Sequence, residues 1–369
     1  MPATFPDQLA LVWERSLSQP GVGGIAATTS VVLLSDRSLD DKADIFRCLD
    51  AETGEQRWQV RYPAVGELDY GNSPRATPLI ADGLVYLQGA FGHLTCADLQ
   101  TGEIRWQKHL RKEFGARDKL VWGTCSSPLI VNGRLIVNPG GPAASLAGLD
   151  PRTGEVLWQT PGPPAAFNSF DVAELGGRLQ LVGHDKASLG GWDPQTGERL
   201  WSIKPRDTND FNVPSPVFHQ GRLIVSTENN GTRLFEFAAG GNAVPRQVAE
   251  NRDLLPDIHT PVVVGDRLFG VWTGLYCLDL TRQLQRVWLG EDNAFHEYAS
   301  IIASDDRLLI SSVEGELLLV DAKADEFRLI SRFQPWEGES GLYAHPALVG
   351  SRLYVRASGA IRCYDLAAT

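Results

Sequence analysis

A set of side chains suited to binding polar ligands recurs where apolar runs of this 369-residue chain begin or turn. Aromatic faces combined with amide, carboxylate and imidazole groups suit a polar small ligand, such as a sugar or the end of a peptide. We therefore expect a ligand-binding funnel, and we assign no catalytic residue. The candidates are Asn72, Arg75, Trp122, Asn138, Asn168, Asn212, Glu228, Asn229, His259, Trp272, His296, Tyr298 and His345. The same segments add Tyr70, Phe167, Phe211 and Tyr343.

Three histidines, His259, His296 and His345, hold matching places before successive apolar runs. Imidazole groups brought together in this way could hold a metal ion or supply a general base. A water-filled channel lined by polar residues would account for the same pattern, and we predict no metal site. The sequence contains no nucleophile elbow, phosphate-binding loop or zinc-ligand spacing.

The segment "TENNGT" at 227–232 supplies Glu228, Asn229 and Asn230, whose side-chain oxygens are of the kind that calcium prefers. A Gly/Asn-rich turn between two strands explains the same residues without any ion. Both interpretations place this segment in a loop.

The elements that must position these residues come from an internal repeat: "LDAETGEQRW" at 49–58, "ADLQTGEIRW" at 97–106, "LDPRTGEVLW" at 149–158 and "WDPQTGERLW" at 192–201. In each copy, the aspartate can accept backbone N–H bonds in a turn and the glycine can take a positive φ. The tryptophan, on the strand that follows, can cover the seam between two repeat units. This predicts a structural role for Asp50, Asp98, Asp150 and Asp193.

A second element, such as "TPLIADGLVYL" at 77–87, precedes most copies and reads as two short strands joined by a turn. Four strands per unit, repeated eight times, predict an all-β, eight-bladed β-propeller of four-stranded antiparallel blades in a single domain, 1–369. The N-terminal strand at 9–17 should close the last blade. The expected blades lie near 22–62, 73–110, 122–161, 168–205, 211–250, 257–290, 296–333 and 342–367.

Composition excludes several classes of partner. The formal net charge of −11 argues against nucleic acid, which needs a concentrated basic surface. No apolar run approaches the length needed to cross a bilayer, so membrane insertion is not expected. We expect a monomer. No signal peptide is evident; the protein is periplasmic or envelope-associated if one was removed, and cytoplasmic if the chain is complete.

The repeats resemble those of the pyrroloquinoline-quinone-like propeller family, with its tryptophan-docking motif. One branch of that family consists of quinoprotein dehydrogenases, which the resemblance associates with a quinone, calcium and a disulfide between neighbouring cysteines. None of the five cysteines here is adjacent to another, so pyrroloquinoline quinone and calcium are not expected. The chain is more similar to the non-enzymatic branch, which presents its surface to protein partners.

The expected function is therefore a non-catalytic binding or scaffolding propeller of the bacterial cell envelope. It would bind a carbohydrate, a peptide or a protein partner on its axial face. The alternative is an enzyme, either a quinone- and calcium-dependent oxidoreductase or a sugar-active lyase or hydrolase that uses the histidine-lined funnel.

Overall fold

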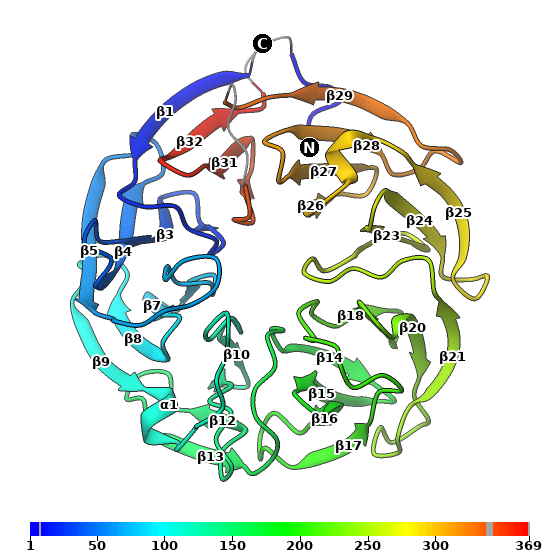
Figure 1. Ribbon diagram of the computed structural model, residues 1–369, viewed down its shortest axis with the longest axis horizontal. Coiled ribbons are helices and arrows are strands. Elements are labelled where there is room, and N and C mark those ends of the chain that lie inside the picture. Colours follow the sequence, from blue (N-terminus) through cyan, green and yellow to red (C-terminus); the bar gives the residue numbers. More distant parts are fainter. Residues whose placement is uncertain (7–8, 337–341, 368–369) are drawn as a thin grey trace.

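The repeated aspartate, glycine and tryptophan form the turn and the outer strand of one blade after another. The computed structural model describes residues 1–6, 9–336 and 342–367. Eight four-stranded antiparallel sheets surround a central axis (Figure 1). The predicted eight-bladed propeller is confirmed.

Seven blades are continuous in sequence, and their strands follow chain order from the axis outward (Figure 1). The first blade comprises β2 (Ala26–Ala27), β3 (Val31–Arg37), β4 (Ala43–Asp50) and β5 (Gln56–Pro63). The second comprises β6 (Leu79–Ala81), β7 (Leu84–Gln88), β8 (His93–Asp98) and β9 (Ile104–His109). The third comprises β10 (Leu129–Val131), β11 (Arg134–Val137), β12 (Leu146–Leu149) and β13 (Val156–Thr160). The fourth blade comprises β14 (Asp171–Leu175), β15 (Arg178–Asp185), β16 (Ser188–Trp192) and β17 (Arg199–Ile203). The fifth comprises β18 (Val217–His219), β19 (Arg222–Thr227), β20 (Gly231–Glu236) and β21 (Arg246–Asn251).

The sixth blade comprises β22 (Val262–Val264), β23 (Arg267–Val271), β24 (Leu275–Asp279) and β25 (Gln285–Gly290). The seventh comprises β26 (Ala299–Ala303), β27 (Arg307–Ser312), β28 (Leu317–Asp321) and β29 (Leu329–Phe333). Two short helical turns connect blades, α1 (Leu110–Glu113) and the 3₁₀ turn η1 (Asn293–Phe295). The innermost strands begin several residues after the predicted unit starts, because each unit opens with a non-strand segment near the axis. We call these the lead segments.

The ring closes through its two ends. The last blade takes β30 (Ala347–Val349), β31 (Arg352–Arg356) and β32 (Ala360–Asp365) from the C-terminal part, and β1 (Ala10–Ser16) completes it as the outermost strand. The register pairs Ala10 with Asp365 and Ser16 with Ala360. In Figure 1 the blue β1 lies beside the red β32. The predicted closure by the N-terminal strand is confirmed, and it gives the last blade four strands like the other seven.

The aspartate of each repeat organises its own turn, as predicted. The Asp50 carboxylate accepts the backbone N–H groups of Glu52 and Thr53, both at 2.9 Å. Asp98, Asp150 and Asp193 accept the corresponding pairs of N–H groups in their turns. These carboxylates have a structural role.

Three of the four repeat tryptophans, Trp58, Trp106 and Trp158, lie against the turn glycine of the next blade, whereas Trp201 donates to Gln180 Oε1 of its own blade. The Trp58 ring lies against Gly102, where an added Cβ would come within 2.7 Å of the indole, and its Nε1 donates to the Leu99 carbonyl at 2.9 Å. Gly102 has a φ of +72° and therefore also needs the conformational freedom of glycine. In these three cases the Thr-Gly step of one blade forms the docking surface for the tryptophan of the preceding blade.

The core lies between blades and not at a single centre. One cluster joins Trp13, Tyr354 and Cys363 of the last blade to Val32 and Leu34 of the first, and all five side chains are buried. All five cysteines are free thiols, and the four at equivalent places in β4, β8, β24 and β32 are buried. These four side chains act as small apolar filler within the blades.

Candidate ligand-binding site

The lead segments and the loops between second and third strands enclose a cavity of about 630 Å³ at the axis, which we call the axial cavity. Proline ends several lead segments directly before the innermost strand, as at Pro78 and Pro128, where a missing N–H does not interrupt the ladder. The lead segments are therefore free to turn towards the axis. The aromatic lining consists of Tyr70, Trp122, Phe167, Phe211, Trp272, Tyr298 and Tyr343.

The aromatic lining contains two groups of contacting rings. Trp122 packs against both Phe167 and Phe211, with ring centroids 4.6 Å apart in each pair. Tyr343 lies 6.0 Å from Tyr70 and 5.9 Å from Tyr298, again between centroids. Phe211 and Tyr70 remain 49% and 61% exposed, so apolar surface faces solvent. Such a concave aromatic surface suits a ligand.

Two carboxylates, Glu228 and Asp257, line the same cavity. Glu228 Oε1 accepts the backbone N–H of Phe211 at 2.5 Å, while its Oε2 is inaccessible to solvent and has no hydrogen-bond partner within the described chain. Burial raises the pKa of both carboxyls, and for Glu228 the neighbouring charges of Asp210 and Asp257 add to this effect. Asp257 was not among the predicted candidates, although it lies in the same lead segment, 256–261, as the predicted His259.

Arg75 lines the cavity, but its guanidinium is committed to the backbone. It donates to the carbonyl oxygens of Trp122 at 2.8 Å, of Asp69 and Gly71 at 2.7 Å each, and of Ser73. Burial lowers its pKa. Arg75 therefore fixes the lead segment of blade two against that of blade three.

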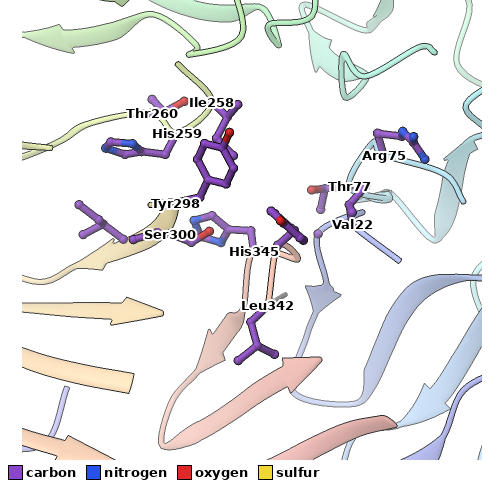
Figure 2. Close-up of a pocket in the computed structure, with 14 residues that line it drawn as sticks. Val22, Arg75, Thr77, Ile258, His259, Thr260, Tyr298, Ser300, Leu342 and His345 are labelled. Atoms are coloured by element: carbon purple, nitrogen blue, oxygen red, sulfur yellow. The ribbon is translucent and has the colours of Figure 1, made fainter. Parts of the chain in front are cut away.

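A smaller cavity of about 220 Å³ adjoins the axial cavity and is lined by His259 and His345 as well as Tyr298 and Arg75 (Figure 2). His259 Nε2 accepts the Val271 N–H at 2.8 Å, and burial lowers its pKa to about 4. Arg75 lies across this cavity from His259 (Figure 2).

The three histidines do not converge. His296 lines neither cavity and ends the η1 turn in an exposed position. Over residues 1–6, 9–336 and 342–367, no three His, Cys, Asp or Glu side chains are grouped to hold a metal ion. The three histidines hold matching sequence positions because the units repeat. Their side chains lie in different surroundings because the three lead segments fold differently.

Five of the predicted asparagines also lie outside both cavities. Asn72 accepts the Leu68 N–H of its own lead segment at 3.0 Å and donates at 2.6 Å to Asp41, in the β3–β4 loop of the first blade. The others are Asn138, Asn168 and Asn212, all buried, and the exposed Asn229. Of the predicted candidates, the cavities bring together Arg75, Trp122, Glu228, His259, Trp272, Tyr298 and His345.

The residues of "TENNGT" do not fit a calcium site. The Asn230 amide nitrogen donates to Asp210 Oδ2 at 2.5 Å and to the Asp207 carbonyl at 2.8 Å, and its oxygen accepts the Asp207 N–H at 2.9 Å. Asn229 donates its own N–H to Asp210 at 2.8 Å. These contacts tie the loop to segment 207–211 and leave Glu228 Oε2 as the one buried side-chain oxygen of the loop without a hydrogen-bond partner in the described structure.

Four-stranded blades, the docked tryptophans and the closure by β1 define a β-propeller of pyrroloquinoline-quinone-like repeats. The family model described as "Outer membrane protein assembly factor BamB" matches residues 7–117 and 41–288. The chain belongs to this family.

Two curated relatives represent both branches. The outer membrane protein assembly factor BamB of Yersinia pestis is 27% identical over 104 residues, covering 27% of this chain and 26% of the relative. The quinoprotein alcohol dehydrogenase PedH of Pseudomonas putida is 27% identical over 135 residues, covering 24% and 23%. The matches thus span about a quarter of each relative. The crystal structure of BamB from Moraxella catarrhalis superposes with a TM-score of 0.64 at 16% identity, over 97% of this chain and 100% of that one, which establishes the shared fold.

Within the described residues, no helix has the length and apolar character required to cross a membrane.

Proposed function

We propose that this chain is a non-catalytic binding or scaffolding propeller of the bacterial cell envelope, and that it binds a peptide or carbohydrate, free or as part of a partner protein, in the axial cavity. The observation that carries this proposal is the aromatic lining of a concave site at the centre of the ring. The name of the family, and of the relative from Yersinia pestis, supports the envelope assignment.

The cavity is suited to binding and offers little chemistry. Its aromatic walls supply contact area, and Glu228 and Asp257 supply hydrogen-bond acceptors. The Arg75 guanidinium is occupied by four backbone carbonyls, and in the adjoining smaller cavity His259 Nε2 accepts the Val271 N–H and is not available as a base. A binding role therefore agrees with the aromatic walls and with the acceptors Glu228 and Asp257.

Binding to arrays of glycans and short peptides tests the proposal. The purified chain should retain at least one probe class, and Trp122→Ala and Phe211→Ala should each lose it. Leu39→Ala is the matched control, because Leu39 is 79% exposed and lies outside the cavity. Retention of the same probes by both aromatic variants, or no binding to any probe, would refute the axial site.

A quinone-dependent oxidoreductase is the second candidate, favoured by the match to PedH. The residues argue against it: Cys125 is the one cysteine among the described residues of the cavity wall, and the 227–232 loop is bonded to its neighbours. Adding pyrroloquinoline quinone and calcium to the protein should leave dye-linked alcohol oxidation at background. Oxidation above that background would reinstate the enzyme.

A further inference from the structure

We propose that the axial cavity recognises a cationic side chain, the guanidinium or ammonium group of an arginine or lysine in a partner peptide or protein. The inference rests on the proposed function and specifies the chemistry of the ligand. It follows from the pairing of aromatic faces with carboxylates that have no cationic partner.

The aromatic lining supplies the first half of a cation site. A cation within about 6 Å of an aromatic centroid is attracted to the ring face, most strongly for tryptophan. Trp122 and Trp272 both line the cavity, and the exposed Phe211 and Tyr70 extend its walls. Because an arginine or lysine side chain also carries an apolar stem, the same walls can bury its methylene groups.

The carboxylates supply the second half. Glu228 Oε2 is withdrawn from solvent without a hydrogen-bond partner, and across the described residues no ion pair reaches Glu228 or Asp257. The nearby Asp210 is also acidic and adds to the negative potential at Glu228. A desolvated carboxylate without a counter-charge is costly, and a bound cation removes that cost.

The position of Arg75 orients the ligand. It is the only lysine, arginine or histidine among the described residues that line the axial cavity, and its donors are held by backbone carbonyls in the lead segments of blades two and three. Glu228 and Asp257 belong to the loop of blade five and the lead segment of blade six. The cation therefore belongs on the side of blades five and six, away from Arg75. The net charge of −11 favours the approach of a basic partner.

The test compares peptides that differ by one charge. The peptides acetyl-Gly-Gly-Xaa-Gly-Gly-amide carry arginine, lysine, citrulline, norleucine or glutamate at Xaa, and calorimetry measures their affinity for the full chain. Citrulline keeps the shape and most hydrogen bonds of arginine but lacks its charge. We expect arginine and lysine to bind about tenfold more tightly than citrulline and norleucine.

Protein variants locate the effect. Glu228→Gln keeps an oxygen for the Phe211 N–H, and Asp257→Asn is equally isosteric; each should weaken arginine binding about fivefold to tenfold and leave citrulline binding unchanged. The control Glu174→Gln alters an exposed carboxylate on β14 that does not line the cavity, and its affinities should match the unaltered protein.

The outcomes separate this inference from the proposed function. Equal affinity for arginine and citrulline peptides, or binding of a glycan with no arginine preference, would overturn the cation inference and leave the axial binding site intact. Failure of every peptide and every glycan to bind would overturn both. Because the citrulline comparison uses the unaltered protein, it does not depend on whether a variant folds.

Discussion

The indole Nε1 of Trp13 donates a hydrogen bond of 3.1 Å to the carbonyl oxygen of Ala51. Trp13 belongs to the last blade and Ala51 to the first, so this contact joins the two ends of the chain. The Trp13 ring also covers Gly54, where an added Cβ would lie 2.5 Å away. The ring of blades is thus closed by the same docking contact that joins the neighbouring blades within it.

Removing this contact should destabilise the whole propeller. Trp13 is 6% exposed, so Trp13→Ala should lower the free energy of unfolding by about 3–5 kcal/mol. Trp13→Phe should lower it by about 1 kcal/mol more than Trp158→Phe does, the value of one hydrogen bond. Trp158→Phe is the control, because Trp158 Nε1 has no partner in the described structure. Urea unfolding measures all three; equal losses for Trp13→Phe and Trp158→Phe would contradict the role of the bond.

The glycine of the repeat should tolerate no side chain. Gly102→Ala adds a Cβ within 2.7 Å of the Trp58 ring at a φ of +72°, so the cost combines overpacking with backbone strain, about 2–4 kcal/mol. Gly83 has a similar φ of +76° but no atom within 4 Å of the added Cβ. Gly83→Ala should therefore cost only about 1 kcal/mol. Thermal unfolding should rank them in this order, and the reverse ranking would show that tryptophan docking is unimportant.

Arg75 should act as a clamp on its lead segment. Arg75→Lys loses the planar fork that reaches four carbonyls, so we expect a loss of about 1–3 kcal/mol and faster hydrogen exchange over residues 68–73. Arg206→Lys, at an exposed arginine, is the control. Unchanged exchange over 68–73 in Arg75→Lys would contradict the clamp.

The thiols should be unreactive in the native protein. Burial raises the pKa of Cys48, Cys96 and Cys363 to about 11 and that of Cys125 and Cys277 to about 12. Near pH 8 each thiol is therefore protonated and a poor nucleophile. A thiol-reactive dye at pH 8 should label none of the five cysteines until guanidinium unfolds the chain. Rapid labelling of any native thiol would contradict this assignment.

The fold could be predicted from the repeats because Asp50 and Gly54 are residues that a turn requires, and Trp58 is a residue that an outer strand favours. Packing between the repeat units decides where each side chain points. The periodicity of the sequence does not contain that information. Asn138 and Asn168 were expected at the axis and are instead buried outside both cavities. Asp257 joined the site because a lead segment folds inward, which a single aspartate in a sequence does not reveal.

The central claim, that ligands bind in the axial cavity, is tested most directly by fluorine NMR of the protein labelled with 5-fluorotryptophan. Trp122 and Trp272 line the cavity, whereas Trp13 and Trp58 dock between blades at the periphery. Adding the tightest-binding probe from the arrays should shift the resonances of Trp122 and Trp272 and leave those of Trp13 and Trp58 in place. Shifts confined to the peripheral tryptophans, with Trp122 and Trp272 unmoved, would contradict the account.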